Sequence, residues 1–141
     1  MGDERQAKGY QPNWDLDRAA GVLGEEYVKK LADAENFVRG FIETKTDYRA
    51  SETGNFYIEY ECNGRPSGIA ITTAETWYLV LLRNGVPTGG AFVETERLKE
   101  IARNYFRFPR YRTTMPGTPG NSDTRGVLIP LSKILEEICK A

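Results

Sequence analysis

The feature that most limits how this chain can fold is an unbroken apolar run at residues 76–82, TWYLVLL. The six consecutive apolar side chains at residues 77–82 leave a strand with no polar face, so other parts of the chain must cover both of its sides. The run is far shorter than the ~20 residues of a membrane span. We therefore expect a buried central strand of a sheet and no membrane partner.

Patterns on either side of this run predict the other elements. Upstream, a helix is predicted to begin at Asp15 and to carry the apolar stripe Leu16, Ala20, Leu23, Tyr27 and Leu31. Residues 72–75 have a capping-box spacing that predicts a short helical turn. Downstream, a turn at residues 84–90 leads into a strand at 91–93, and a helix runs from Glu94 or Thr95 to about Tyr105. Residues 113–125 are predicted to be structureless and residues 126–130 to form an edge strand. A closing helix carries the apolar stripe Leu131, Ile134, Leu135 and Ile138.

Length and composition fit one domain. The chain has 141 residues, of which 40% are apolar, and this is enough for one core but not for two. Residues 1–13 are polar and aperiodic, so we expect a loose arm there and a single domain over residues 14–141. The mixture of strands and helices predicts an α/β or α+β fold, in which a mixed central sheet with an antiparallel hairpin is flanked by helices.

The titratable residues exclude several kinds of chemistry. There is no histidine, and the two cysteines, Cys62 and Cys139, are far apart, so histidine triads, zinc sites and a disulfide framework are not expected. Reduced thiols point to a cytoplasmic, intracellular protein. The net charge is −1, yet residues 1–60 carry 12 acids and 8 bases whereas residues 61–141 carry 8 acids and 11 bases. The second half can therefore offer a local positive surface.

Residues 41–61, FIETKTDYRASETGNFYIEYE, combine two alternating runs with acids and a lysine. In an extended chain Glu43, Lys45 and Asp47 share one face, and beyond a polar break ending at Gly54-Asn55 the residues Tyr57, Glu59 and Glu61 share another. If the two runs pair as a hairpin, several carboxylates and Lys45 converge. Carboxylate oxygens on a rigid sheet suit Mg²⁺ or Mn²⁺. The alternative is a solvated face of paired Glu and Lys side chains.

The predicted first helix offers a further acid. Measured from the apolar stripe, Glu26 lies about 100° from its centre and Glu25 lies roughly opposite it. We therefore choose Glu26 as the candidate for holding a metal or positioning water. The alternative is that Glu26 only pairs with Lys30, four residues on.

The segment 42–45 (IETK), together with Gly24-Glu25-Glu26 upstream, resembles the PD-(D/E)XK nuclease superfamily. Residues 53–61 (TGNFYIEYE), 64–69 (GRPSGI) and 72–77 (TTAETW) are similar to small phage-type members, and the usable likeness spans roughly residues 15–83. The resemblance implies a restriction-endonuclease-like core and Mg²⁺- or Mn²⁺-dependent cleavage of DNA. It implies Glu43 and Lys45 as catalytic residues, with Glu26, Glu43, Asp47 and Glu59 as metal ligands. Related junction resolvases are homodimers that cut branched DNA, so a homodimer is the analogous expectation.

The sequence departs from that superfamily where an aspartate is expected shortly before the Glu-x-Lys strand. Asp33, Glu35, Asp47 and Glu59 are the candidates to replace it. A second registration is also open, in which Glu43 or Asp47 takes the place of the aspartate and residues 59–61 act as a Glu-x-Glu variant.

Candidate nucleic-acid contacts lie mainly in the second half. Residues 103–112, RNYFRFPRYR, interleave four arginines with four aromatics, which suits phosphates and exposed bases; the alternative is an aromatic core under a solvated arginine face. The candidate contacts are Arg49, Ser67, Thr72, Arg103, Arg107, Arg110 and Arg112. Three functions remain open: a metal-dependent DNA endonuclease, a catalytically inactive nucleic-acid-binding module on the same scaffold, and a protein-interaction domain of a phage or mobile element.

Overall fold

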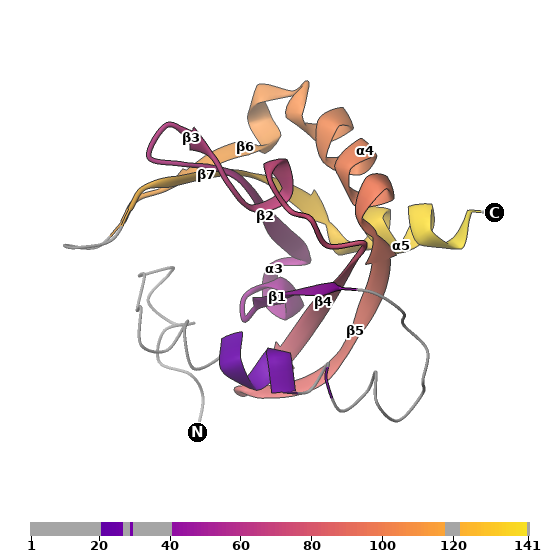
Figure 1. Ribbon diagram of the computed structural model, residues 1–141. Helices are drawn as coiled ribbons and strands as arrows, with labels where there is room; N and C mark the ends of the chain where they lie inside the picture. The colour runs from indigo at the N-terminus through magenta and orange to yellow at the C-terminus, as the bar shows by residue number, and fades with distance from the viewer. Residues whose placement is uncertain (1–20, 27–28, 30–40, 118–121, 141) are drawn as a thin grey trace.

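Two β-sheets and the helices packed on them form the part of the chain that the computed structural model describes, residues 21–26, 29, 41–117 and 122–140 (Figure 1). One sheet is mixed and the other is antiparallel, so the expected α+β class is confirmed. The proposed arm at residues 1–13, the helix start at Asp15 and the candidate acids Asp33 and Glu35 lie outside the described residues.

The apolar run forms the central strand of the first sheet. Strand β4 (Thr76–Arg83) lies between β1 (Ile42–Asp47), which runs parallel to it, and β5 (Val86–Glu94), which runs antiparallel. The side chains of Leu79 and Val80 are 0% exposed. The predicted buried strand is therefore confirmed. Strand β5 is longer than expected, because residues 87–90, predicted to be a turn, pair with β4.

The second sheet has the order β3-β2-β7-β6, and all of its pairs are antiparallel. Its strands are β2 (Asn55–Cys62), β3 (Arg65–Pro66), β6 (Arg112–Met115) and β7 (Thr124–Pro130). The prediction that residues 126–130 are an edge strand is wrong, because β6 pairs along the outer side of β7. Strand β6 also occupies part of the stretch 113–125 that was expected to be structureless.

The predicted hairpin between residues 41–47 and 56–61 is wrong, because β1 and β2 belong to different sheets. Helix α3 (Ala50–Thr53) lies between them and ends at Gly54, whose φ of 75° is readily adopted by glycine. The Ser51 hydroxyl donates to the carbonyl of Leu82 at 2.7 Å, and the Leu131 N–H donates to the Gly54 carbonyl at 2.7 Å. The short helix thus carries the chain from the first sheet to the second.

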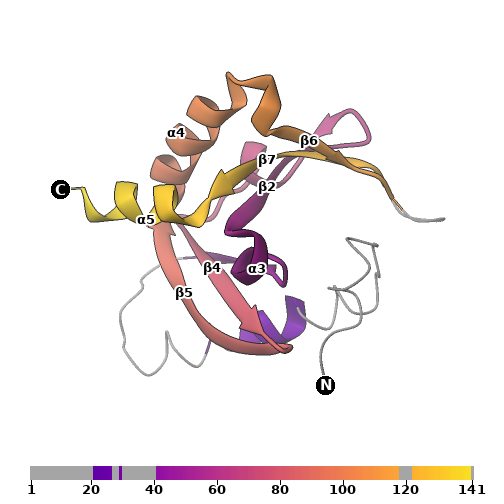
Figure 2. The same cartoon turned by 180° about the vertical axis from the view of Figure 1, so that it is seen from behind.

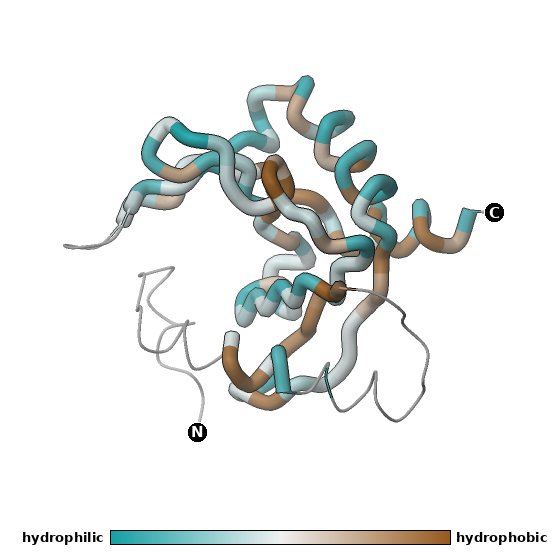
Figure 3. The backbone as a smooth tube through the Cα atoms, viewed as in Figure 1, coloured by the Kyte–Doolittle hydropathy of each residue, from teal (hydrophilic) through white to brown (hydrophobic). Residues whose placement is uncertain are grey.

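Helices α4 (Thr95–Phe106) and α5 (Leu131–Cys139) match the predicted helices closely. Figure 2 shows α4 beside the second sheet and α5 where β7 ends. Along α4, hydrophilic and more hydrophobic positions alternate (Figure 3), as expected for a helix with one buried side. The capping-box turn predicted at residues 72–75 is wrong; a 3₁₀ turn, η1 (Gly68–Ala70), precedes these residues instead. A second 3₁₀ turn, η2 (Pro109–Tyr111), follows α4.

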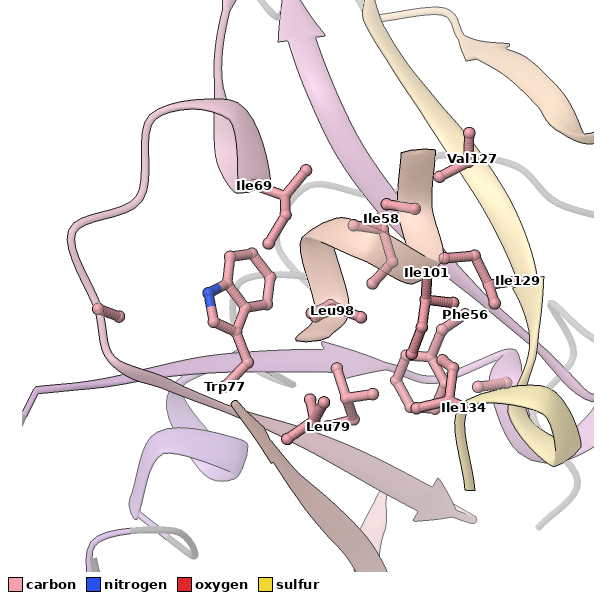
Figure 4. Packing of buried hydrophobic residues seen from close by; sticks show 14 residues of the cluster. Phe56, Ile58, Ile69, Trp77, Leu79, Leu98, Ile101, Val127, Ile129 and Ile134 are labelled. Atoms are coloured by element: carbon pink, nitrogen blue, oxygen red, sulfur yellow. The ribbon is translucent and has the colours of Figure 1, made fainter. Parts of the chain in front are cut away.

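One core cluster draws on both sheets and both long helices (Figure 4). Its largest fully buried members are Phe56, Ile58, Leu79, Leu98, Val127, Ile129 and Ile134. A smaller cluster on the opposite face of β4 consists of Tyr78, Val80 and Leu82, with Ile42, Tyr48 and Phe92 packed against it. Both faces of β4 are therefore covered. Among the described residues, no helix has the length and apolar content needed to cross a membrane.

Neighbouring residues on α5 provide a test of how this helix docks. Ile134→Ala should lower the free energy of unfolding by about 2–5 kcal/mol, because it removes a fully buried side chain. Leu135→Ala, on a side chain that is 42% exposed, should cost less than about 1 kcal/mol. Urea denaturation of the two variants measures the difference. Equal losses would contradict the packing of α5 through Ile134.

Candidate active site

Strand β1 places Glu43, Lys45 and Asp47 on one face, as the alternation predicts. In the parallel register Glu43 is opposite Trp77 and Lys45 is opposite Leu79, so this face is the one that β4 turns toward the main core. Strand β1 is at the edge of its sheet, and all three polar residues are only half-buried. They are therefore held on the rigid sheet and remain open to solvent.

The Asp47 carboxylate connects the two sheets. Its Oδ1 accepts a hydrogen bond from the Arg49 N–H at 3.0 Å, and its Oδ2 accepts one from the Tyr57 N–H at 3.2 Å. The first bond closes the turn after β1 and the second reaches β2. Each oxygen keeps a further lone pair, so its predicted role as a metal ligand remains a prediction, but its geometry already serves the fold.

Lys45 lies beside Tyr57, with its Nζ 5.6 Å from the centroid of the ring. The ring itself is held from two sides. Its hydroxyl is hydrogen-bonded to the Thr124 hydroxyl at 2.9 Å, and Gly126 leaves room beneath it, since a Cβ there would lie 2.5 Å from a ring carbon. The arrangement fits a weak cation–π contact between the ammonium and a fixed aromatic surface. Sequence reasoning assigned Tyr57 only to a strand face and missed this contact.

The surroundings of Glu43 perturb its ionisation. Burial raises the pKa of its carboxyl, the negative charge of Glu25 raises this pKa further, and the ammonium of Lys45 opposes both effects. One other carboxylate and one ammonium therefore act on the Glu43 carboxyl. Such a group of charges is more typical of functional sites than of neutral scaffold surface.

The helix acid that acts on Glu43 is Glu25, whereas the sequence favoured Glu26. Residues 21–26 are helical, and Gly24 is buried against β1, where an added Cβ would overlap Thr46 Oγ1. The role of Glu26 as a metal ligand stays a prediction. Counted from Gly24, Glu25 is turned by about 100° and Glu26 by about 200°. Leu23, a member of the predicted stripe, is 37% exposed.

Glu59 lies on β2, two residues from Tyr57 and on the same face. Its Oε2 accepts a hydrogen bond from the Ser67 hydroxyl at 2.8 Å. Gly68 follows with a φ of 52°, and an added Cβ there would overlap the main chain of Glu59. The GRPSGI segment thus fixes the position of Glu59, although not through the predicted hairpin.

Glu61 does not share the face of Tyr57 and Glu59, which corrects the simple alternation. A β-bulge at Tyr60 shifts the register, so that Glu59 is opposite Gly126 and Glu61 is opposite Arg125. Glu61 instead forms an ion pair with Arg125, with 3.3 Å between its Oε2 and the arginine Nε. After this extra residue, the side chains of β2 exchange the faces that simple alternation would give them.

Within the described residues, no group of three or more cysteine or acidic side chains is arranged to hold a metal ion. A complete protein cage is therefore absent from this part of the chain. Mg²⁺ in nucleases and kinases usually takes only one or two carboxylates, with water and substrate phosphate completing its shell. Glu43 is the first candidate for such a carboxylate, and a divalent cation would relieve the repulsion from Glu25 that adds to the effect of burial on its pKa.

The predicted phosphate contacts are distributed differently. The hydroxyl of Ser67 is bonded to Glu59, and Thr72 Oγ1 accepts the Ala74 N–H at 3.2 Å rather than heading a helical turn. Arg49 lies at the start of α3 and gives its N–H to Asp47. These three residues therefore have local structural contacts, and their contact with phosphate stays a prediction.

The arginine and aromatic segment is a surface feature. Phe106 and Phe108 are 43% and 52% exposed, so the alternative that the aromatics are core does not hold for them. The Arg110 guanidinium carbon lies 4.8 Å from the ring centroid of Tyr111, and that of Arg112 lies 5.0 Å from the ring centroid of Phe106. In Figure 1 the turn that follows α4, which contains η2, lies above the second sheet and away from β1. The segment is thus separate from Glu43 and Lys45.

Comparison of the chain with protein-family models, with curated protein sequences and with solved structures finds no match. The site must therefore be interpreted from its own geometry.

Asp47 and Glu43 form a matched pair for testing their different roles. Asp47→Asn should lower the free energy of unfolding by about 1.5–3 kcal/mol, because an amide nitrogen replaces one of two charged acceptors of backbone N–H groups. Glu43→Gln, two residues away on the same face, should not be destabilising. Chemical denaturation at pH 7 compares them, and a harmless Asp47→Asn would argue against the bridge between the sheets.

Stability should depend on pH through Glu43. Because its pKa is raised in the folded protein, the folded state keeps this proton to a higher pH than the unfolded chain does. Below a glutamate's ordinary pKa of about 4.3, wild type and Glu43→Gln should be equally stable. As the pH rises through that value the wild type should lose stability relative to the variant, by up to about 0.5 kcal/mol for a solvent-screened group. Unfolding midpoints at pH 4 and pH 7 measure this, and a difference of the opposite sign would contradict it.

Proposed function

We propose that this protein is a divalent-metal-dependent nuclease that hydrolyses phosphodiester bonds of DNA. The observation that carries the proposal is the electrostatic grouping at Glu43, where a second carboxylate, Glu25, and the ammonium of Lys45 act on one half-buried acid. With no histidine in the chain, hydrolysis of a phosphodiester would use carboxylate, lysine, tyrosine, hydroxyl or metal chemistry, and a carboxylate and a lysine lie together here.

Glu43 and Glu25 would hold Mg²⁺ or Mn²⁺, with Asp47 and Glu59 as the next candidate ligands. The bound ion would polarise the phosphate and lower the pKa of a coordinated water. Lys45, two residues from Glu43 and steadied by Tyr57, is placed to orient the attacking water or to offset charge that develops on the phosphate. Ser67 keeps the Glu59 carboxylate on the same side as Tyr57.

Arg107, Arg110 and Arg112, with the exposed Phe106 and Phe108, would provide a second contact with the DNA backbone. Arginine neutralises phosphates regardless of sequence, so this surface would add affinity rather than recognition of a particular site. A homodimer acting on branched DNA remains an analogy with junction resolvases.

A catalytically inactive DNA-binding module is the second candidate. The observation that favours it is that no set of three metal-ligating side chains occurs in the described part of the chain. Such a module would keep the arginine surface and would retain DNA in the absence of a divalent ion.

Nicking of supercoiled plasmid DNA in Mg²⁺ or Mn²⁺ tests the proposal. Lys45→Ala should reduce the cleavage rate about 10²- to 10³-fold, the usual effect of removing one transition-state contact. Glu43→Gln should abolish cleavage and also abolish any rise in the thermal midpoint on addition of Mn²⁺. Metal-independent DNA retention without nicking would favour the inactive module.

Variants of the adjacent residues Glu25 and Glu26 test which of these two helix acids takes part in cleavage. Glu25→Gln should reduce nicking, whereas Glu26→Gln should not, because only Glu25 acts on Glu43. Glu52→Gln, an exposed acid on α3, is a control for loss of a negative charge alone. If Glu26→Gln reduced nicking and Glu25→Gln did not, the result would support Glu26 as the metal or water-positioning residue and would contradict a role for Glu25.

A further inference from the structure

A hollow of about 270 Å³ lies between α4 and the second sheet, away from Glu43. Its walls include Tyr60 of β2, Val127 of β7 and Phe106 of α4, with Ile69 of η1 at one end. Tyr60 lies on the core side of β2, as Phe56 and Ile58 do, whereas Glu59 belongs to the other face. The hollow and the candidate active site are therefore on opposite faces of the second sheet.

The walls of this hollow are apolar and partly aromatic. The rings of Tyr60 and Phe106 are in edge-to-face contact, with centroids 5.2 Å apart and an interplanar angle of 88°. Phe106 nevertheless stays 43% exposed, which is unusual for a large apolar residue beside a cavity. The volume is slightly below the range of about 300–1,000 Å³ typical of pockets for drug-sized ligands, so the occupant should be a small flat group.

The rim of the hollow is positive. Lys99 and Arg103 are one turn apart on α4 and both line the opening. Lys99 has one weak partner, the exposed Glu96, at 3.4 Å, while Arg103 has no ion-pair partner among the described residues. Arg112 lies over the Phe106 ring at 5.0 Å and extends the charge toward η2. An anionic group is thus expected at the mouth.

We propose that this hollow is a nucleotide subsite, in which an unpaired base occupies the space beside Tyr60 and Phe106 and its phosphate lies against Lys99 and Arg103. Cations and aromatics interleave in the sequence from Arg103 to Arg112, and Arg110 and Arg112 each lie over an aromatic ring. This pattern matches a strand of alternating phosphates and bases better than it matches a single amphipathic acid. The inference rests on the proposed function only in taking DNA as the ligand, and it makes single-stranded or frayed DNA the preferred form.

The test uses fluorescence anisotropy of the full chain with a labelled 12-nucleotide single strand, in a chelator that prevents cleavage. Phe106→Ala should weaken binding about 5- to 150-fold, the range for loss of one base–aromatic contact. Leu135→Ala, at the almost identical exposure of 42%, is the matched control and should bind as wild type does. Arg103→Ala should reduce the slope of log affinity against log salt by about 1, and Arg83→Ala should leave it unchanged.

A second comparison identifies the base as the group that is bound. Wild type should prefer the normal strand over one in which every base is replaced by an abasic site, and this preference should disappear in Phe106→Ala. Equal affinity for the two strands, equal affinity for the corresponding duplex, or wild-type binding by Phe106→Ala would overturn the proposal. Competition by dAMP at the same site would support the subsite and make a free nucleotide the ligand.

Plasmid nicking by the same preparations separates this inference from the proposed function. Loss of single-strand binding in Phe106→Ala, in a protein that never cleaves, would support the subsite and reject the nuclease. If the wild type cleaves DNA and Phe106→Ala binds the single strand as tightly as the wild type does, the result would support the nuclease and reject the subsite. Sedimentation that shows a Phe106-dependent dimer with no effect on DNA would also overturn the subsite, because the hollow would then take a second copy of the chain.

Discussion

The paired hydrogen bonds of the Asp47 carboxylate are the constraint on which the candidate site depends. One oxygen closes the turn that follows β1, and the other holds the backbone of Tyr57 at the start of β2. Since β1 and β2 belong to different sheets, no ladder of strand hydrogen bonds fixes their relative position. Lys45 can face the Tyr57 ring because this carboxylate and helix α3 bring the two strands together.

The charges around Glu43 are arranged at a cost to the fold. A partly buried acid next to a second acid is destabilised in its ionised form, and Lys45 offsets only part of this effect. Natural proteins tend to tolerate such arrangements where they serve binding or catalysis. Tyr57, fixed by Thr124 and Gly126, adds a rigid surface that limits where the lysine ammonium can lie.

Local sequence patterns predicted the elements whose own apolar side chains show which side is buried. Strand β4 and helices α4 and α5 follow directly from apolar runs and stripes. Pairing of strands could not be predicted in the same way, because alternation shows which residues share a face and not which strand lies alongside. Strand β1 therefore appeared to be one arm of a hairpin, whereas it pairs in parallel with β4, and the polar strand β6 was missed because only its pairing with β7 defines it.

The candidate site was predictable to the same extent. The strand face with Glu43, Lys45 and Asp47 was correct, since a period of two is a local property. Glu25 was missed because the rotation of its helix is set by Gly24 against Thr46, and a stripe of apolar side chains gives no weight to a glycine. The bulge at Tyr60 left no sign in the sequence, because it appears only in the pairing of β2 with β7.

That bulge makes the length of β2 as important as its composition. Because of the single extra residue, Tyr60 and Glu61 both lie away from the face of Glu59, and Glu61 reaches Arg125. Deletion of Tyr60 would leave Glu59 opposite Gly126 and Glu61 opposite Arg125, and it would remove one aromatic wall of the hollow. A change of one residue in length could therefore remove the hollow during evolution while the face that carries Glu59 stays in place.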